Sequence, residues 1–156
     1  MNNETGLFMN HESYLLLATE QNTRFQFQSI GKRGIFEKVI SFSPLSEIIF
    51  NLALLDYNPV TGEENDLSIT DNGDLHQIMA TVMKAILLFL DKHPEKVIYI
   101  KGNTESRTRL YQISINKVYP DLQHELLILG QQNENWHDFK VNESFDSFLI
   151  AKKNLT

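Results

Sequence analysis

The strongest pattern of apolar and polar positions covers Leu75–Leu90, where apolar residues recur every three or four positions. This period is that of an amphipathic α-helix. Asp74 and Gln77 fit a capping box at its start, with Asp in place of Ser or Thr, and Pro94 marks its far end. The apolar stripe is wide, which predicts that the helix lies across a sheet. Its other side is polar, with Gln77, Thr81 and Lys84.

Residues before this helix alternate with the period of β-strands. The strands predicted from this alternation, Arg24–Ile30 and Ile35–Phe42, flank the tetrapeptide Gly31–Gly34. Its two glycines suit a tight hairpin turn with φ > 0. We therefore expect a hairpin with a lysine and an arginine at its exposed tip. Tyr14–Ala18 can add a short first strand.

A central strand is predicted at Glu47–Asp56, where the sequence is almost continuously apolar. Such a run is typical of a strand covered on both faces, and a helix from Ser46 is the alternative. Val97–Lys101 is a second buried strand, which follows the helix. The succession strand, helix, strand predicts a parallel crossover between these two strands.

A second helix is predicted over Glu105–Tyr119, capped by Thr104 and stopped by Pro120. Its apolar residues recur at helical spacing along one side. A strand is the alternative for its middle, because apolar and polar residues also alternate through Tyr111, Ile113 and Ile115.

Two further strands, Glu125–Leu129 and Phe145–Lys152, end the pattern, with Trp136 in the connection between them. The order strands, helix, strand, helix, two strands indicates an α+β fold. We predict a single domain over residues 13–156, after a flexible N-terminal tail over residues 1–12. Its sheet is expected to be single, mixed and mostly antiparallel, with two helices.

Amino-acid composition disfavours some classes of binding partner and excludes reactions that need a thiol. The chain has 156 residues, a 42% apolar share and a 22% charged share, which are ordinary for a globular protein. A net charge of −6 disfavours nucleic acid and anionic membranes as partners. The lack of cysteine excludes disulfides, thiol catalysis and thiolate metal sites. The first residues resemble no signal peptide, so we expect a cytoplasmic protein without a membrane span; the oligomeric state stays unknown.

One charged residue, Arg107, lies on an apolar helix face, one turn before Tyr111. An unpaired buried guanidinium is costly, so it must pair, reach solvent or bind a ligand. We expect a pair with a carboxylate from the region Asp56–Asp74, and the alternative is an anion site at the strand-to-helix switch. The candidate ligand-binding residues are Asp56, Asn72, Asp74, Lys101, Arg107 and Tyr111.

Other chemistry is weakly indicated. The acidic residues between positions 56 and 74 could collect a hard cation, but their spacing fits no calcium loop. The five histidines are scattered, with no metal-like pair at helical spacing. We therefore expect a solvated loop, surface histidines and no metal. The sequence contains no hydrolase elbow, phosphate-binding loop or dinucleotide fingerprint.

The order of elements, with Asn103-Thr104 and Leu110-Tyr111 at the second helix, resembles the GNAT acyltransferase superfamily. The resemblance implies an acyl-coenzyme A cofactor and Tyr111 as a general acid. The stretch Ser68–Asp74 departs from the cofactor motif of that superfamily. Its two aspartates place negative charge at the helix start expected to hold pyrophosphate. We therefore expect that coenzyme A does not bind in the usual way.

A second resemblance spans most of the chain and rests on short motifs in its two halves. These are Asp56-Tyr57 with Thr61-Gly62, Asn72-Gly73-Asp74 with Ala80-Thr81-Val82, and Lys101-Gly102 with Arg107 to Tyr111. They are similar to motifs of a small, uncharacterised bacterial domain family. The resemblance supports the α+β fold and implies no activity.

The leading functional hypothesis is a non-catalytic binding or regulatory module of a bacterial cell. Its partner would be an unknown protein or a small anionic ligand, bound without a cofactor around the candidate residues. The alternative is a divergent acyltransferase with a degenerate cofactor loop, which would use acetyl-coenzyme A. In that enzyme Tyr111 would be the general acid and Arg107 would hold an anionic group.

Overall fold

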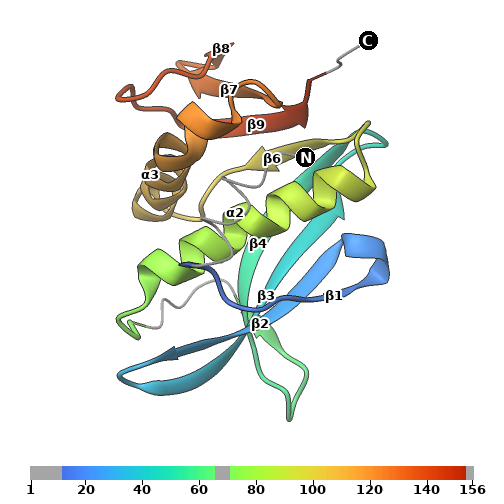
Figure 1. Cartoon of the computed structure of the whole chain (residues 1–156), viewed down its shortest axis with the longest axis vertical. Coiled ribbons are helices and arrows are strands. Elements are labelled where there is room, and N and C mark those ends of the chain that lie inside the picture. Colours follow the sequence, from blue (N-terminus) through green and yellow to red (C-terminus); the bar gives the residue numbers. More distant parts are fainter. Residues whose placement is uncertain (1–11, 66–70, 154–156) are drawn as a thin grey trace.

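The computed structural model describes residues 12–65 and 71–153. Within these residues nine strands form one mixed sheet in the order β1-β2-β3-β4-β6-β9-β7-β8, with β5 beside β4. The α-helices of the described chain, α2 and α3, pack on the sheet (Figure 1). This architecture confirms the predicted α+β fold with one mixed sheet. Residues 1–11 of the predicted tail lie outside the described residues.

The first half of the sheet is an antiparallel meander. Its elements are β1 (Leu17–Thr19), the short 3₁₀ helix η1 (Glu20–Asn22), β2 (Arg24–Gly31), β3 (Gly34–Pro44), β4 (Ile49–Tyr57) and β5 (Glu64–Asn65). The register places Gly31 opposite Gly34, so Lys32 and Arg33 form the tip of the β2–β3 hairpin, as predicted. Gly34 has a φ of +115°, in the region that favours glycine.

The centre of the sheet is a parallel pair. β6 (Val97–Ile100) runs parallel to β4, with Ile49 opposite Val97, which confirms the predicted crossover. Leu52 of β4 is buried under the helices, and Ala53 and Leu55 on the other face are partly buried. The described helices pack on one face of the strand, while the other face is partly covered by the sheet's own side chains, since Val39 opposite Leu55 is fully buried.

The second half of the sheet contains β7 (Leu126–Gln132), β8 (Asn135–Asp138) and β9 (Ser147–Lys152). β9 lies between β6 and β7 and is antiparallel to both, so the predicted pairing of the last two strands is confirmed. β8 was not predicted, and Trp136 lies in it rather than in an open connection. Asn133 and Glu134 form its turn with φ values of 50° and 68°, without the glycine that usually announces a hairpin.

The helices α2 (Leu75–Lys92) and α3 (Glu105–Leu122) enclose the core against one face of the sheet. α2 crosses the strands of the meander, whereas α3 lies toward β7 and β9 (Figure 1). Aromatic rings hold α2 to the sheet: Phe42 and Phe89 stack with centroids 4.4 Å apart. The helix thus joins the two halves of the sheet.

The start of α3 confirms one prediction and its end corrects another. The hydroxyl of Thr104 accepts a hydrogen bond of 3.1 Å from the backbone N–H of Arg107, as expected for the cap. The helix then continues through Pro120 to Leu122. The predicted stop was wrong, because a proline in the last turn removes one backbone donor without preventing the helix from finishing that turn. The alternative of a strand in this segment is excluded.

Candidate functional site

Asn72 is buried beneath the tip of the β2–β3 hairpin and makes three side-chain hydrogen bonds there. Its Oδ1 accepts from Arg33 N–H at 2.7 Å, and its Nδ2 donates to Gly34 O at 3.0 Å and to Ser29 Oγ at 3.1 Å. The fit is close, since a Cβ on Gly31 would lie 1.9 Å from the carbonyl oxygen of Asn72. Asn72 therefore fastens the hairpin to the start of α2.

Asp74 is 3% exposed and does not act as the predicted helix cap. Its Oδ2 accepts hydrogen bonds of 2.5 Å from the hydroxyls of Tyr14 and Ser29, while Oδ1 has no partner among the described residues. The capping-box prediction was wrong because two hydroxyls from outside the helix turn the carboxylate away from its amides. Burial, together with the bond to Asp74, raises the pKa of the Tyr14 hydroxyl.

The segment that carries Tyr14 contacts Thr81, one residue on the side of α2 predicted to be polar. Thr81 Oγ1 accepts from the backbone N–H of Tyr14 at 2.8 Å and donates to the carbonyl of Gln77 at 2.7 Å. Thr81 is fully buried as a result. The chain just after Glu12 is therefore attached to α2 by backbone as well as side-chain contacts.

Asp56 lies at the far end of β4 from the parallel pair. It forms an ion pair with Lys38, a buried lysine opposite it on β3. Both residues belong to the face of the sheet that the helices cover, and the pair satisfies a charge that would be costly to bury alone. This contact gives Asp56 a structural partner within the sheet.

The remaining candidates lie at the start of α3 and do not converge. Lys101 is exposed at the edge of a polar cleft of about 1060 Å³ beside that helix. Arg107 is 7% exposed, and no carboxylate of the described residues lies within ion-pair distance of it. Tyr111 is 4% exposed in the core and borders neither this cleft nor the groove described below. The described carboxylates of the region Asp56–Asp74 do not pair with Arg107, and Asp66 of that region lies outside the described residues, so the pairing stays a prediction.

Some sequence predictions cannot be placed. Asp66, which belongs to the acidic region, and Ser68–Thr70, which belong to the predicted cofactor stretch, lie outside the described residues. Asp71 is described and forms a long, exposed pair of 3.9 Å with Lys32. Negative charge therefore does lie beside the start of α2.

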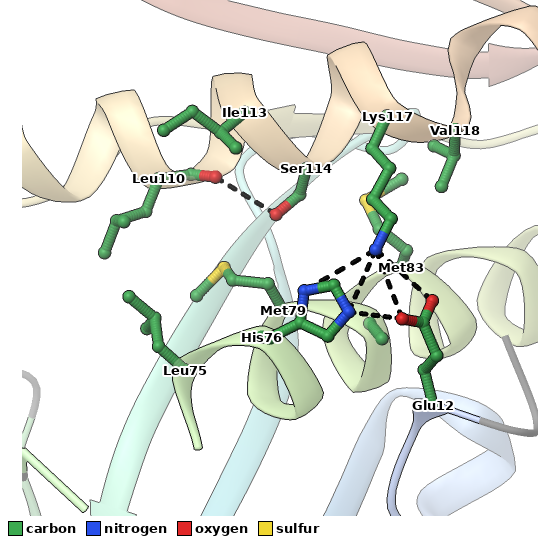
Figure 2. A pocket seen from close by; sticks show the side chains of 11 residues that line it. Glu12, Leu75, His76, Met79, Met83, Leu110, Ile113, Ser114, Lys117 and Val118 are labelled. Atoms are coloured by element: carbon green, nitrogen blue, oxygen red, sulfur yellow. Dashed lines mark hydrogen bonds and ion pairs between the residues drawn. The ribbon is translucent and has the colours of Figure 1, made fainter. Parts of the chain in front are cut away.

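The structure reveals a different candidate site, a groove of about 260 Å³ between α2 and α3 (Figure 2). Its lining is mostly apolar, with Met79 and Met83 reaching in from α2 and Leu110 from α3. Among the described lining residues, Ser114 alone carries a hydroxyl, and its Oγ donates back to the carbonyl of Leu110 at 3.0 Å. Further lining residues are Leu75, Ala80, Ile113 and Val118.

A polar cluster of Glu12, His76 and Lys117 closes one end of this groove (Figure 2). Lys117 Nζ donates to both oxygens of Glu12, at 3.2 and 3.3 Å, and lies 2.9 Å from His76 Nε2. His76 Nε2 also bonds Glu12 Oε1. Hydrogen bonding to His76, with help from Lys117, holds the pKa of the Glu12 carboxyl below its usual range despite desolvation by burial.

Sequence reasoning missed this cluster because its members are far apart in the chain. Glu12 is 64 positions from His76 and 105 positions from Lys117. In the structure, Leu75 and Ile113 are apolar residues at the facing edges of α2 and α3, and they are 43% and 53% exposed. Such residues at the facing edges of two helices indicate a groove.

The described residues contain neither a cluster suited to a metal ion nor a membrane-spanning helix. Among residues 12–65 and 71–153, no group of three histidine, aspartate or glutamate side chains is placed to hold a metal ion. None of the helices in this part of the chain has the length and apolar character needed to cross a membrane. The cytoplasmic location stays a prediction.

Comparison with known proteins identifies a family and no activity. The chain matches the model of a family of unknown function, DUF6934, over residues 10–153, and it belongs to this family. This membership confirms the resemblance to an uncharacterised domain family. No curated protein and no solved structure matches the chain.

Proposed function

We propose that this member of DUF6934 is a non-catalytic binding module whose small ligand lies in the groove between α2 and α3. The observation that carries the proposal is the chemistry of the groove: an apolar channel with its charged groups gathered at one end. Binding sites for small molecules commonly combine an apolar lining with a few polar groups that fix orientation. The groove, at about 260 Å³, suits a ligand smaller than a typical drug molecule.

The lining favours binding over catalysis. Met79 and Met83 contribute thioethers, which adapt to the shape of an apolar ligand and supply no acid, base or nucleophile. Ser114 uses its hydroxyl proton on the helix backbone. The titratable groups lie together at the rim, where they satisfy one another.

Methionine-methyl NMR tests the proposal directly, because two of the four methionines in the chain line the groove. We expect 1-octanol to shift the methyl signals of Met79 and Met83 in a saturable way. Ala80→Phe, which fills the groove, should abolish these shifts. Ala53→Phe, the same change on the face of β4 away from the helices, should leave them intact. If the protein is folded and the two methyl signals do not shift when 1-octanol is added, the proposal is overturned.

A divergent acyltransferase remains the second candidate, favoured by the parallel pair at the centre of the sheet. β4 and β6 are paired over three residues, and ligands in related α/β arrangements bind where such strands end. Against this candidate, Tyr111 is buried and would have to become accessible to donate a proton. Acetyl-coenzyme A at millimolar concentration should raise the melting temperature if the candidate is right, and Arg107→Ala should remove that rise.

A further inference from the structure

The polar end of the groove already holds a carboxylate, that of Glu12. Both of its oxygens lie within 3.3 Å of Lys117 Nζ, and one also bonds His76. The side chain of Glu12 is 19% exposed, so the carboxylate is enclosed by its partners rather than extended into water. The position is therefore shaped and charged for a carboxylate.

The contacts that hold Glu12 there are weak enough to exchange. His76 and Lys117 are both exposed, and ion pairs at exposed positions contribute about 0–1 kcal/mol. The chain beside Glu12 is fixed independently, through the backbone N–H of Tyr14 on Thr81. The Glu12 side chain can thus leave its partners without detaching that segment from α2.

The groove beyond this position accepts an apolar tail and little else. Met83 lies beside Lys117, and Met79, Ile113 and Leu110 line the groove farther from the charged groups (Figure 2). The volume of about 260 Å³ equals that of about nine water molecules in the liquid, which is close to one eight-carbon chain. A second charge on the tail would be desolvated among thioether and aliphatic groups without a partner.

We propose that the ligand of the groove is a small monocarboxylate with an apolar tail, whose carboxylate replaces that of Glu12 between His76 and Lys117. This inference rests on the function proposed above and adds the chemical class of the ligand. Glu12 then acts as an internal competitor: it keeps the two partner groups satisfied when the groove is empty and is displaced when the ligand binds.

The test compares three probes of equal length, octanoate, 1-octanol and octylamine, by methyl shifts of Met79 and Met83 at neutral pH. We expect octanoate to bind roughly tenfold more tightly than the other two. Glu12→Gln should strengthen octanoate binding by roughly three- to tenfold, because it removes the competing charge, and should leave octanol binding unchanged.

Two lysine variants complete the design. Lys117→Gln should weaken octanoate to the affinity of octanol, whereas Lys92→Gln, which removes the same charge at the far end of α2, should have no effect. Equal binding of all three probes, unaffected by Glu12→Gln, would refute the carboxylate while leaving the groove as a binding site. Absence of any shift at Met79 and Met83 with every probe would refute both proposals.

Discussion

Two carboxylates near the start of α2 have opposite surroundings. Asp74 is buried and accepts hydrogen bonds from the neutral hydroxyls of Tyr14 and Ser29. Glu12 lies at the edge of a groove beside His76 and Lys117, which solvent can reach. Both side chains connect the first described residues to the helices, yet only one of these connections can be exchanged for another molecule.

The difference lies in what remains when each carboxylate is removed. Without Asp74, the Ser29 hydroxyl would be left without this acceptor inside the protein, and an unsatisfied buried polar group costs about 1–3 kcal/mol. Without Glu12, His76 and Lys117 can turn to water or to another anion. Buried polar groups with neutral partners therefore hold the fold, while the exposed charged cluster is free to take part in binding.

Removal of the buried carboxylate should have the largest effect. Asp74→Ala is expected to lower the free energy of unfolding by about 1–3 kcal/mol, because it leaves the buried Ser29 hydroxyl without its acceptor. The Tyr14 hydroxyl loses one acceptor and keeps the carbonyl of Ile30 at 3.1 Å. Urea denaturation measures the loss. Asp71→Ala is the matched control at the same helix start, where the carboxylate is exposed, and should change stability by less than about 0.5 kcal/mol. Similar losses for both variants would contradict the comparison.

Alkaline pH should reduce the contribution of the Tyr14–Asp74 contact to the free energy of unfolding and leave that of Glu12 unchanged. The pKa of Tyr14 is raised in the folded protein, so its neutral form is favoured there. Its contribution to stability is complete below the usual tyrosine pKa of about 10 and is lost as pH rises through the folded value. Tyr14→Phe should remove this alkaline component, whereas Tyr57→Phe should retain it. Unfolding midpoints in urea between pH 8 and 11 provide the measurement.

Acid should reduce the contribution of the Glu12 contacts to the free energy of unfolding, and this effect should be the smallest of the three. The pKa of Glu12, which faces His76 and Lys117, is lowered in the folded protein. Its contribution is therefore present above the usual value of 4.5 and is lost as pH falls through the lower folded value. The free energy of unfolding of the wild type should exceed that of Glu12→Gln by at most about 1 kcal/mol at pH 7, and the difference should shrink as the pH falls below 4.5. A difference that persisted unchanged to pH 3 would show another cause.

The sequence predicted the sheet well where the signals were local. The β2–β3 hairpin follows from alternation and two glycines, and the crossover from β4 to β6 follows from the helical repeat between them. β8 was missed because Asn133 and Glu134 adopt positive φ without glycine. Local patterns identify elements whose turn chemistry is ordinary.

The candidate site was less predictable because its contacts are distant in sequence. Asp74 was predicted to cap its own helix, but its hydrogen-bond partners come from the N-terminal segment and β2. Arg107 was correctly placed on a buried face, although no described carboxylate pairs with it. The groove needs the relative placement of α2 and α3, which no periodicity within one helix reveals.

The short parallel ladder between β4 and β6 also has a kinetic consequence. Hairpins such as β2–β3 close small loops and form rapidly, whereas the pairing of Ile49–Asn51 with Val97–Tyr99 must close a long loop for few hydrogen bonds. Contacts of this kind slow folding. The middle of the sheet should therefore assemble last, and native-state hydrogen exchange should detect the two antiparallel halves as separate opening units.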